Sequence, residues 1–106
     1  MTQANAAEAL LILIVAPKLE DMLVDFLLQQ NTISGFTSLP VSGHCSVRGH
    51  VQLSLVEQVT GRQNRVQFML HAPLPVLHSL IEEVRQKFQN TDMHYILLPV
   101  LEAQSI

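Results

Sequence analysis

Apolar residues form an unbroken run near the start of the chain. Every residue from Ala9 to Ala16 is apolar, and most of them are Ile or Leu. A short run without polar interruption is typical of a strand buried on both faces in the middle of a sheet. It is also well short of the roughly 20 residues that a membrane helix needs. The pattern therefore predicts a central strand and no direct membrane insertion.

Two later segments carry apolar residues at helical spacing. The first begins at Pro17 and ends near Asn31, and the second begins at Pro73 and ends near Asn90. In both segments the apolar residues recur every three or four positions, while charged residues take the opposite face. The apolar positions are Leu19, Met22, Leu23, Phe26 and Leu27 in the first segment, and Leu77, Leu80, Ile81, Val84 and Phe88 in the second. We expect two amphipathic helices, each with one face in the core.

Three further segments read as strands: residues 36–41, 66–70 and 95–98. Pro40 lies within the first of these and indicates an edge position, because proline cannot donate to a central ladder. The resulting order, β-α-β-β-α-β, predicts an α+β fold of the ferredoxin-like kind, with two helices on one face of an antiparallel sheet. Residues 1–7 show no pattern and are expected to form a flexible leader. Residues 8–106 form the single domain.

The connection between the second and third strands is unusually long. It runs from residue 43 to residue 65, whereas hairpin connections have about two to five residues, and long connections usually carry function. The chain has a net charge of −3. Within residues 43–65, Arg48, Arg62 and Arg65 against Glu57 give +2, so the other residues sum to −5. We expect a basic loop on an acidic body.

Composition narrows the class of protein. Of all residues, 48% are hydrophobic and 14% are charged, with a mean hydropathy of +0.28. This is too apolar for a disordered chain, and it indicates that some apolar surface faces another subunit. The acidic balance argues against nucleic-acid binding. The single cysteine, Cys45, excludes an internal disulfide and fits a reducing cytoplasm.

Several segments carry a resemblance to a known family. They are Gly35-Phe36-Thr37, Gly43 to His50, Asn64 to Phe68, and the ending Tyr95 to Val100. In these segments the chain resembles the PII nitrogen-regulatory signal proteins, whose long T-loop joins the second and third strands. The resemblance implies a homotrimer whose loop binds a target protein, such as a transporter or an enzyme. The partner-binding residues it points to are Gly43, Arg48, Gly49, Arg62 and Arg65.

The chain departs from the PII pattern where that family binds nucleotide or is modified. Thr37 stands where the family's threonine contacts adenine. However, Asn90 to His94 replace a glycine-rich loop with its lysine, and the family's C-terminal arginine pair is absent. The only tyrosine, Tyr95, lies outside the loop. We therefore expect neither ATP and 2-oxoglutarate sensing nor uridylylation.

A second hypothesis concerns metal. His44, Cys45 and His50 lie within seven residues of the loop, and imidazole and thiolate are ligands that Zn²⁺ and Cu⁺ prefer. The alternative function is thus a metal-binding trimer, similar to the divalent-cation tolerance proteins and linked to heavy-metal tolerance or efflux. A simpler interpretation also stays open, since Gly-His belongs to the PII loop pattern and a free cysteine often acts as a small hydrophobe.

Enzymatic function is not expected. The turn after the first strand, residues 15–18, has neither the glycines nor the arginine of a phosphate cradle. Cys45 and His44 are chain neighbours, so their spacing does not support a nucleophile and its base. An amino-acid-binding domain of the same element order normally has a short hairpin where this chain has its long connection, and that reading ranks below the other two.

Overall fold

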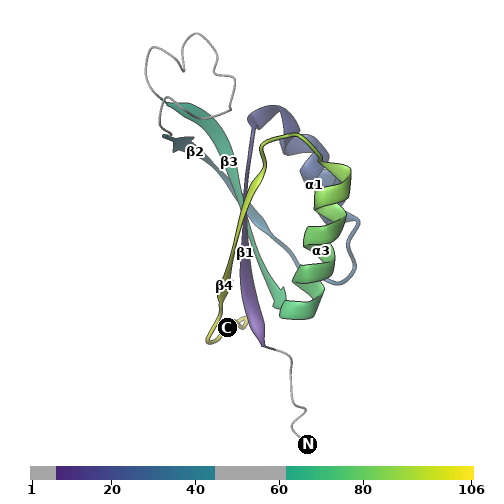
Figure 1. The fold of residues 1–106 in the computed structure, drawn as a ribbon. Coiled ribbons are helices and arrows are strands. Elements are labelled where there is room, and N and C mark those ends of the chain that lie inside the picture. The colour runs from purple at the N-terminus through teal and green to yellow at the C-terminus, as the bar shows by residue number, and fades with distance from the viewer. Residues whose placement is uncertain (1–6, 45–61) are drawn as a thin grey trace, which may run out of the picture.

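The structure, a computed structural model, describes residues 7–44 and 62–106. Within these residues, four strands and two α-helices follow one another in the order β-α-β-β-α-β (Figure 1). The elements are β1 (Glu8–Val15), the short 3₁₀ helix η1 (Pro17–Leu19), α1 (Glu20–Leu28), β2 (Thr37–Gly43), β3 (Gln63–Pro73), α3 (Leu74–Lys87) and β4 (His94–Pro99). The predicted element order is confirmed.

The four strands form one antiparallel sheet in the order β2-β3-β1-β4. β1 and β3 occupy the middle, so the apolar run at the start of the chain is a central strand, as predicted. β2 lies at an edge of the sheet, as Pro40 predicts. Proline has no backbone N–H to donate, and an edge strand tolerates this better than a central strand does. Both helices lie on the same face of the sheet (Figure 1). The α+β class, the antiparallel sheet and the two helices are confirmed.

In the single chain β1 is buried on one face only, and the predicted burial of its second face stays a prediction. Its residues alternate along the strand: Ala9, Leu11, Leu13 and Val15 are buried, whereas the residues between them are only half-buried. Successive side chains of a strand point to opposite faces, and α1 and α3 cover one face alone. Within the described chain, β1 therefore presents apolar side chains to a face that the helices leave open.

The helices supply most of the remaining core. Leu23, Phe26 and Leu27 of α1 pack against Leu77, Leu80, Ile81 and Val84 of α3 and against the sheet. The apolar stripe predicted for the first helix holds except at Met22, which is 52% exposed. The chain first makes a 3₁₀ turn over Pro17–Leu19, and the α-helix begins only at Glu20. Without Met22, the buried stripe is narrower than the spacing predicts.

The third strand is longer than its alternating pattern indicates. It begins at Gln63 and pairs with β2 as far as Gly43, so the predicted loop of residues 43–65 is too wide. Gly43 and Arg65 are strand residues, and Arg65 stands opposite Val41. The prediction missed this extension because the polar residues that open β3 carry no period-two signal. None of the described helices is long and apolar enough to cross a membrane.

Two leucines of α1 test the packing of the core. Leu23 is fully buried, whereas Leu28 is 70% exposed at the end of the same helix. Leu23→Ala should lower the free energy of unfolding by about 2–5 kcal/mol, because it leaves a cavity between helix and sheet. Leu28→Ala, the matched control, should change it by no more than about 0.5 kcal/mol. Urea denaturation at one protein concentration measures both, and equal losses would contradict the packing described.

Candidate functional site

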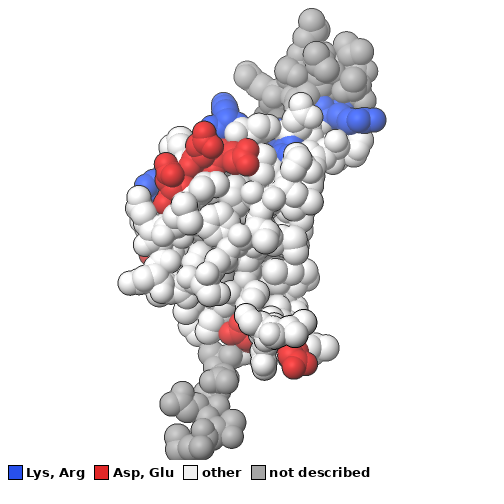
Figure 2. Space-filling model, turned by 180° about the vertical axis from the view of Figure 1, so that it is seen from behind, with Lys and Arg blue, Asp and Glu red and all other residues white. Residues whose placement is uncertain are grey.

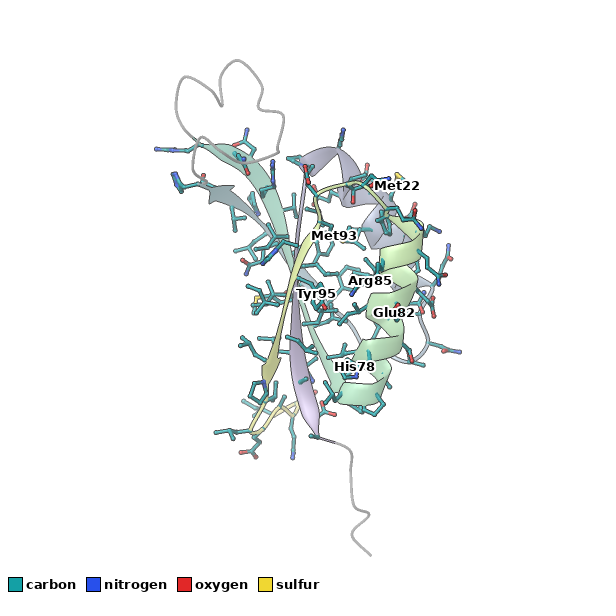
Figure 3. The ribbon with its side chains drawn as sticks, viewed as in Figure 1. Met22, His78, Glu82, Arg85, Met93 and Tyr95 are labelled. Atoms are coloured by element: carbon teal, nitrogen blue, oxygen red, sulfur yellow. The ribbon has the colours of Figure 1, made fainter. Side chains whose placement is uncertain are left out.

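A cavity of about 350 Å³ lies between the C-terminal half of α3 and the beginning of β4. It is on the side of the sheet that the helices cover, and the residues around it can be followed in Figure 3. The loop that joins α3 to β4 closes one end. The lining residues are Leu13, Ile81, Val84, Arg85, Phe88, Gln89, Asn90, Thr91, Asp92, Met93 and Tyr95.

Arg85 of α3 and Tyr95 of β4 both line the cavity and contact one another there (Figure 3). The Arg85 guanidinium carbon lies 5.8 Å from the centre of the Tyr95 ring, and Nη2 donates to the tyrosine hydroxyl at 3.4 Å. The Glu82 carboxylate lies 3.6 Å from Nε of Arg85, one helical turn away. An aromatic face and a carboxylate thus orient this cation at the rim of the cavity.

The loop between α3 and β4 has an unusual backbone. Asn90 and Asp92 have φ values of 60° and 57°, in the left-handed region that asparagine and aspartate tolerate better than most residues. Between them, the Thr91 hydroxyl donates to the backbone oxygen of Phe88 at 2.6 Å and so closes the end of α3. The two left-handed residues reverse the chain sharply. The polar side chains of residues 89–92 consequently line the cavity.

The floor of the cavity is part of the core. Phe88 is buried and meets Phe26 of α1 edge to face, with ring centres 6.0 Å apart. Leu13 reaches the cavity from β1, and Met93 packs against the core from the loop side. The cavity therefore has an apolar floor that is built from three elements and a rim that carries polar groups.

A second feature is the open face of the sheet. The paired residues of adjacent strands share a face, and this places Leu10, Ile12 and Ile14 of β1 in rows with residues of the other strands. One row reads Thr37, Met69, Ile12, Ile96, and the next reads Leu39, Gln67, Ile14, His94; Leu10 stands between His71 and Leu98. Most of these side chains are apolar. Leu39, Ile96 and Leu98 are 38–44% exposed.

The third feature is the end of the sheet where the chain leaves β2 and returns to β3. Gly43 and Gln63 stand opposite one another, so residues 44–62 start and finish at the same place. Arg62 and Arg65 lie there, and Arg65 Nη1 donates to the backbone oxygen of Asn64 at 2.7 Å. Figure 2 shows blue side chains at this end of the sheet, apart from the red carboxylates gathered over the first helices.

The structure places the predicted site residues unequally. His44 is exposed directly after β2, but Cys45, Arg48, Gly49 and His50 lie outside the described residues. Within residues 7–44 and 62–106, no three His, Cys, Asp or Glu side chains form a group that could hold a metal ion. The metal hypothesis stays a prediction. Thr37 opens β2 on the open face of the sheet, opposite Met69.

The cavity between α3 and β4 was not predicted. The sequence predicts a helix that ends near Asn90, followed by a segment, Asn90 to His94, that replaces the glycine-rich loop of the PII proteins. The sequence did contain a signal for this loop. Asparagine and aspartate, which tolerate the left-handed backbone conformation, stand on either side of a threonine between a predicted helix and a predicted strand.

Comparison with known proteins identifies the family of this chain. A family model described as a protein of unknown function, DUF3240, matches residues 5–106. The chain belongs to this family. No curated protein matches the DUF3240 chain.

A crystal structure of another DUF3240 family protein, from Shewanella baltica OS155 at 2.40 Å resolution, is similar to this chain. The two share 20% sequence identity over 95% of this chain and 98% of that one, with a TM-score of 0.76. At this identity the likeness shows a common fold. The comparisons establish DUF3240 membership, and the resemblance to the PII proteins stays a prediction.

The backbone of the α3–β4 loop yields a test. Asn90→Val should lower the free energy of unfolding by about 1–2 kcal/mol, because a β-branched residue is strained in the left-handed region. Asn90→Gly, which adopts this conformation without strain, should stay within about 0.5 kcal/mol of the wild type. Chemical denaturation measures both variants. If valine were tolerated as well as glycine, residue 90 would not adopt the conformation described.

Proposed function

We propose that this DUF3240 protein is a PII-like regulatory protein. Three copies pack their open sheet faces together into a rigid body, and the segment between β2 and β3 binds a target protein, such as a transporter or an enzyme. The regulatory protein itself senses neither ATP nor 2-oxoglutarate, is not uridylylated and is not an enzyme. The observation that carries the proposal is the apolar face of the sheet that α1 and α3 leave open.

The composition of that face supports packing between copies. Its two middle strands contribute Leu10, Ile12, Ile14 and Met69, and the edge strand β4 adds two exposed apolar residues. Proteins that act as monomers rarely expose contiguous apolar patches larger than a few hundred Å². Four strands about 4.8 Å apart and about 27 Å long span roughly 500 Å² in projection. A stable interface buries about 800 Å² of accessible surface per partner, which is the same order.

The fold supports the same proposal. The β-α-β-β-α-β order, with β1 and β3 in the middle of the sheet, supports assignment to the ferredoxin-like plan. This plan places helices on one face only, so the second face is available for contact with another copy. A second and a third copy cover it with the same apolar side chains, and closed symmetry then satisfies every copy equally.

The pairing of β2 with β3 supports the role of the connecting segment. Because Gly43 and Gln63 stand opposite one another, both ends of residues 44–62 are held by the sheet. Arg62 and Arg65 make this end of the sheet basic, which suits an acidic surface on the target. Tyr95, the only tyrosine, lies in β4 beside Arg85, away from the segment that would be modified in a PII protein.

Association between copies is tested on the open face. Ile96→Glu places a charge on β4 at a position that is 38% exposed, so the single chain should still fold. A buried, unpaired charge costs about 3 kcal/mol or more, which corresponds to at least about 100-fold weaker association. Analytical ultracentrifugation should therefore show trimers for the wild type and monomers for Ile96→Glu.

The matched control is Met22→Glu, which adds the same charge to an exposed methionine of α1 on the helix-covered side. This variant should remain trimeric. A wild type that sediments as a monomer at micromolar concentration would contradict the proposed assembly, as would equal dissociation of the two variants.

The connecting segment is tested by shortening it. Replacing residues 45–61 with Asn-Gly gives a tight hairpin between β2 and β3, which the opposed positions of Gly43 and Gln63 accommodate. The shortened chain should remain trimeric. Affinity capture from cells of the source organism, followed by mass spectrometry, should recover a target with the full chain and lose it with the shortened one.

Binding of the purified target to both chains would then be compared by calorimetry. Equal affinity for the full and shortened chains would contradict a role for the segment, whatever the oligomeric state.

A further inference from the structure

The cavity between α3 and β4 has the size and the two-sided chemistry of a small-molecule site. Its volume of about 350 Å³ falls within the range of about 300–1,000 Å³ that is usual for ligand pockets. Leu13, Ile81 and Phe88 belong to an apolar floor, while the rim carries polar groups from the α3–β4 loop. A ligand that fills it needs an apolar body and a polar end.

The charges at the rim limit what that polar end can be. Of the described residues that line the cavity, two are charged: Arg85 and Asp92. One cation and one anion do not suit a polyphosphate, because its charges need several cations or an array of donors. They suit a ligand that carries one negative and one positive group.

Arg85 is oriented to receive the negative group. A guanidinium has five N–H donors, and its contacts with Tyr95 and Glu82 engage at most two of them. The remaining donors can form the paired hydrogen bonds with a carboxylate that arginine favours. The Arg85 side chain is 59% exposed, and its contact with the Tyr95 ring places the guanidinium at the rim of the cavity.

Asp92 is placed for the positive group. It lies in the α3–β4 loop and lines the cavity, and its left-handed backbone directly follows the residue that forms the Thr91–Phe88 hydrogen bond. A carboxylate accepts hydrogen bonds from an ammonium group and compensates its charge. The α3–β4 loop thus adds a negative charge that complements the positive charge of Arg85.

We infer that this cavity binds a free α-amino acid with an apolar side chain. Arg85 binds its carboxylate, Asp92 binds its ammonium group, and its side chain enters the floor next to Leu13 and Ile81. The site does not depend on the proposed trimer, because it lies on the helix-covered side and the copies meet on the other side of the sheet. Ligand binding to residues of β4 and the loop would add a signal input to the regulatory protein.

The test titrates the full-length chain with L-leucine, L-methionine and L-phenylalanine, followed by backbone amide NMR and by calorimetry. Saturable shifts should cluster at residues 85–95. 4-Methylpentanoate, which lacks the ammonium group of leucine, and 3-methylbutylamine, which lacks the carboxylate, should each bind about 10- to 100-fold more weakly. Absence of saturable shifts with all three amino acids would overturn the proposal, and so would equal binding of either analogue.

Variants locate the site. Arg85→Gln and Asp92→Asn should each weaken binding of the amino acid by about 10- to 100-fold. Asparagine is well suited to the left-handed backbone of residue 92, so the loop should keep its shape. Lys87→Gln is the control, because Lys87 lies over the Phe26 ring and outside the cavity lining. Unchanged affinity in both variants, or an equal loss in the control, would overturn the assignment.

These measurements separate the two proposals. Ile96→Glu, which should abolish association between copies, leaves the cavity lining intact. Amino-acid binding by its monomer supports the site. Loss of binding in that monomer alone, with a native NMR spectrum, would overturn the claim that one chain completes the site.

Discussion

The structure depends on a sheet that is apolar on both faces, of which the helices in residues 7–44 and 62–106 cover one. The alternation of buried and half-buried residues in β1 shows this directly: Leu11 and Leu13 are in the core, while Ile12 between them is not. The same row continues across the sheet through Met69 and Ile96. Burial of apolar area is the main favourable term in folding and in association. Covering this face would therefore stabilise the protein further.

The one-sided cover also explains where the cavity lies. The helices pack most closely over the central strands, with Leu23 and Leu77 fully buried, and β4 remains an edge strand with Tyr95 and Leu98 exposed. The gap between α3 and this edge is closed by the short loop of residues 88–93 rather than by another helix. Its left-handed residues turn the chain back to the sheet and bring polar side chains to an apolar floor.

The three features of the molecule are spatially separate. The open face can bury apolar area between copies without involving Arg85 or the α3–β4 loop. The end of the sheet at Gly43 and Gln63 holds the connecting segment on strands that also form the open face. The proposed assembly, the proposed partner-binding segment and the cavity can therefore be altered one at a time, which makes each functional proposal separately testable.

Much of the fold was determined by the sequence alone, because local periodicity reports local structure. The apolar run of residues 9–16, the two helical stripes and Pro40 led to the correct element order, the central place of β1 and the edge place of β2. The exposure of Met22 and the extension of β3 to Gln63 depended on packing and pairing with distant segments, which periodicity does not contain.

The candidate site was decided almost wholly by the tertiary structure. Arg85 and Tyr95 are ten residues apart, and their chain neighbours give no reason to join them; they meet because α3 packs over a sheet whose edge strand returns beside it. Leu13 enters the same cavity from the far end of the sequence. The amino-acid sequence determined which side chains were available, and the spacing of its apolar residues determined where helices and strands form. Only the packing of the helices on one face decided which side chains share a cavity and which face of the sheet stays open, because both depend on contacts between segments far apart in the chain.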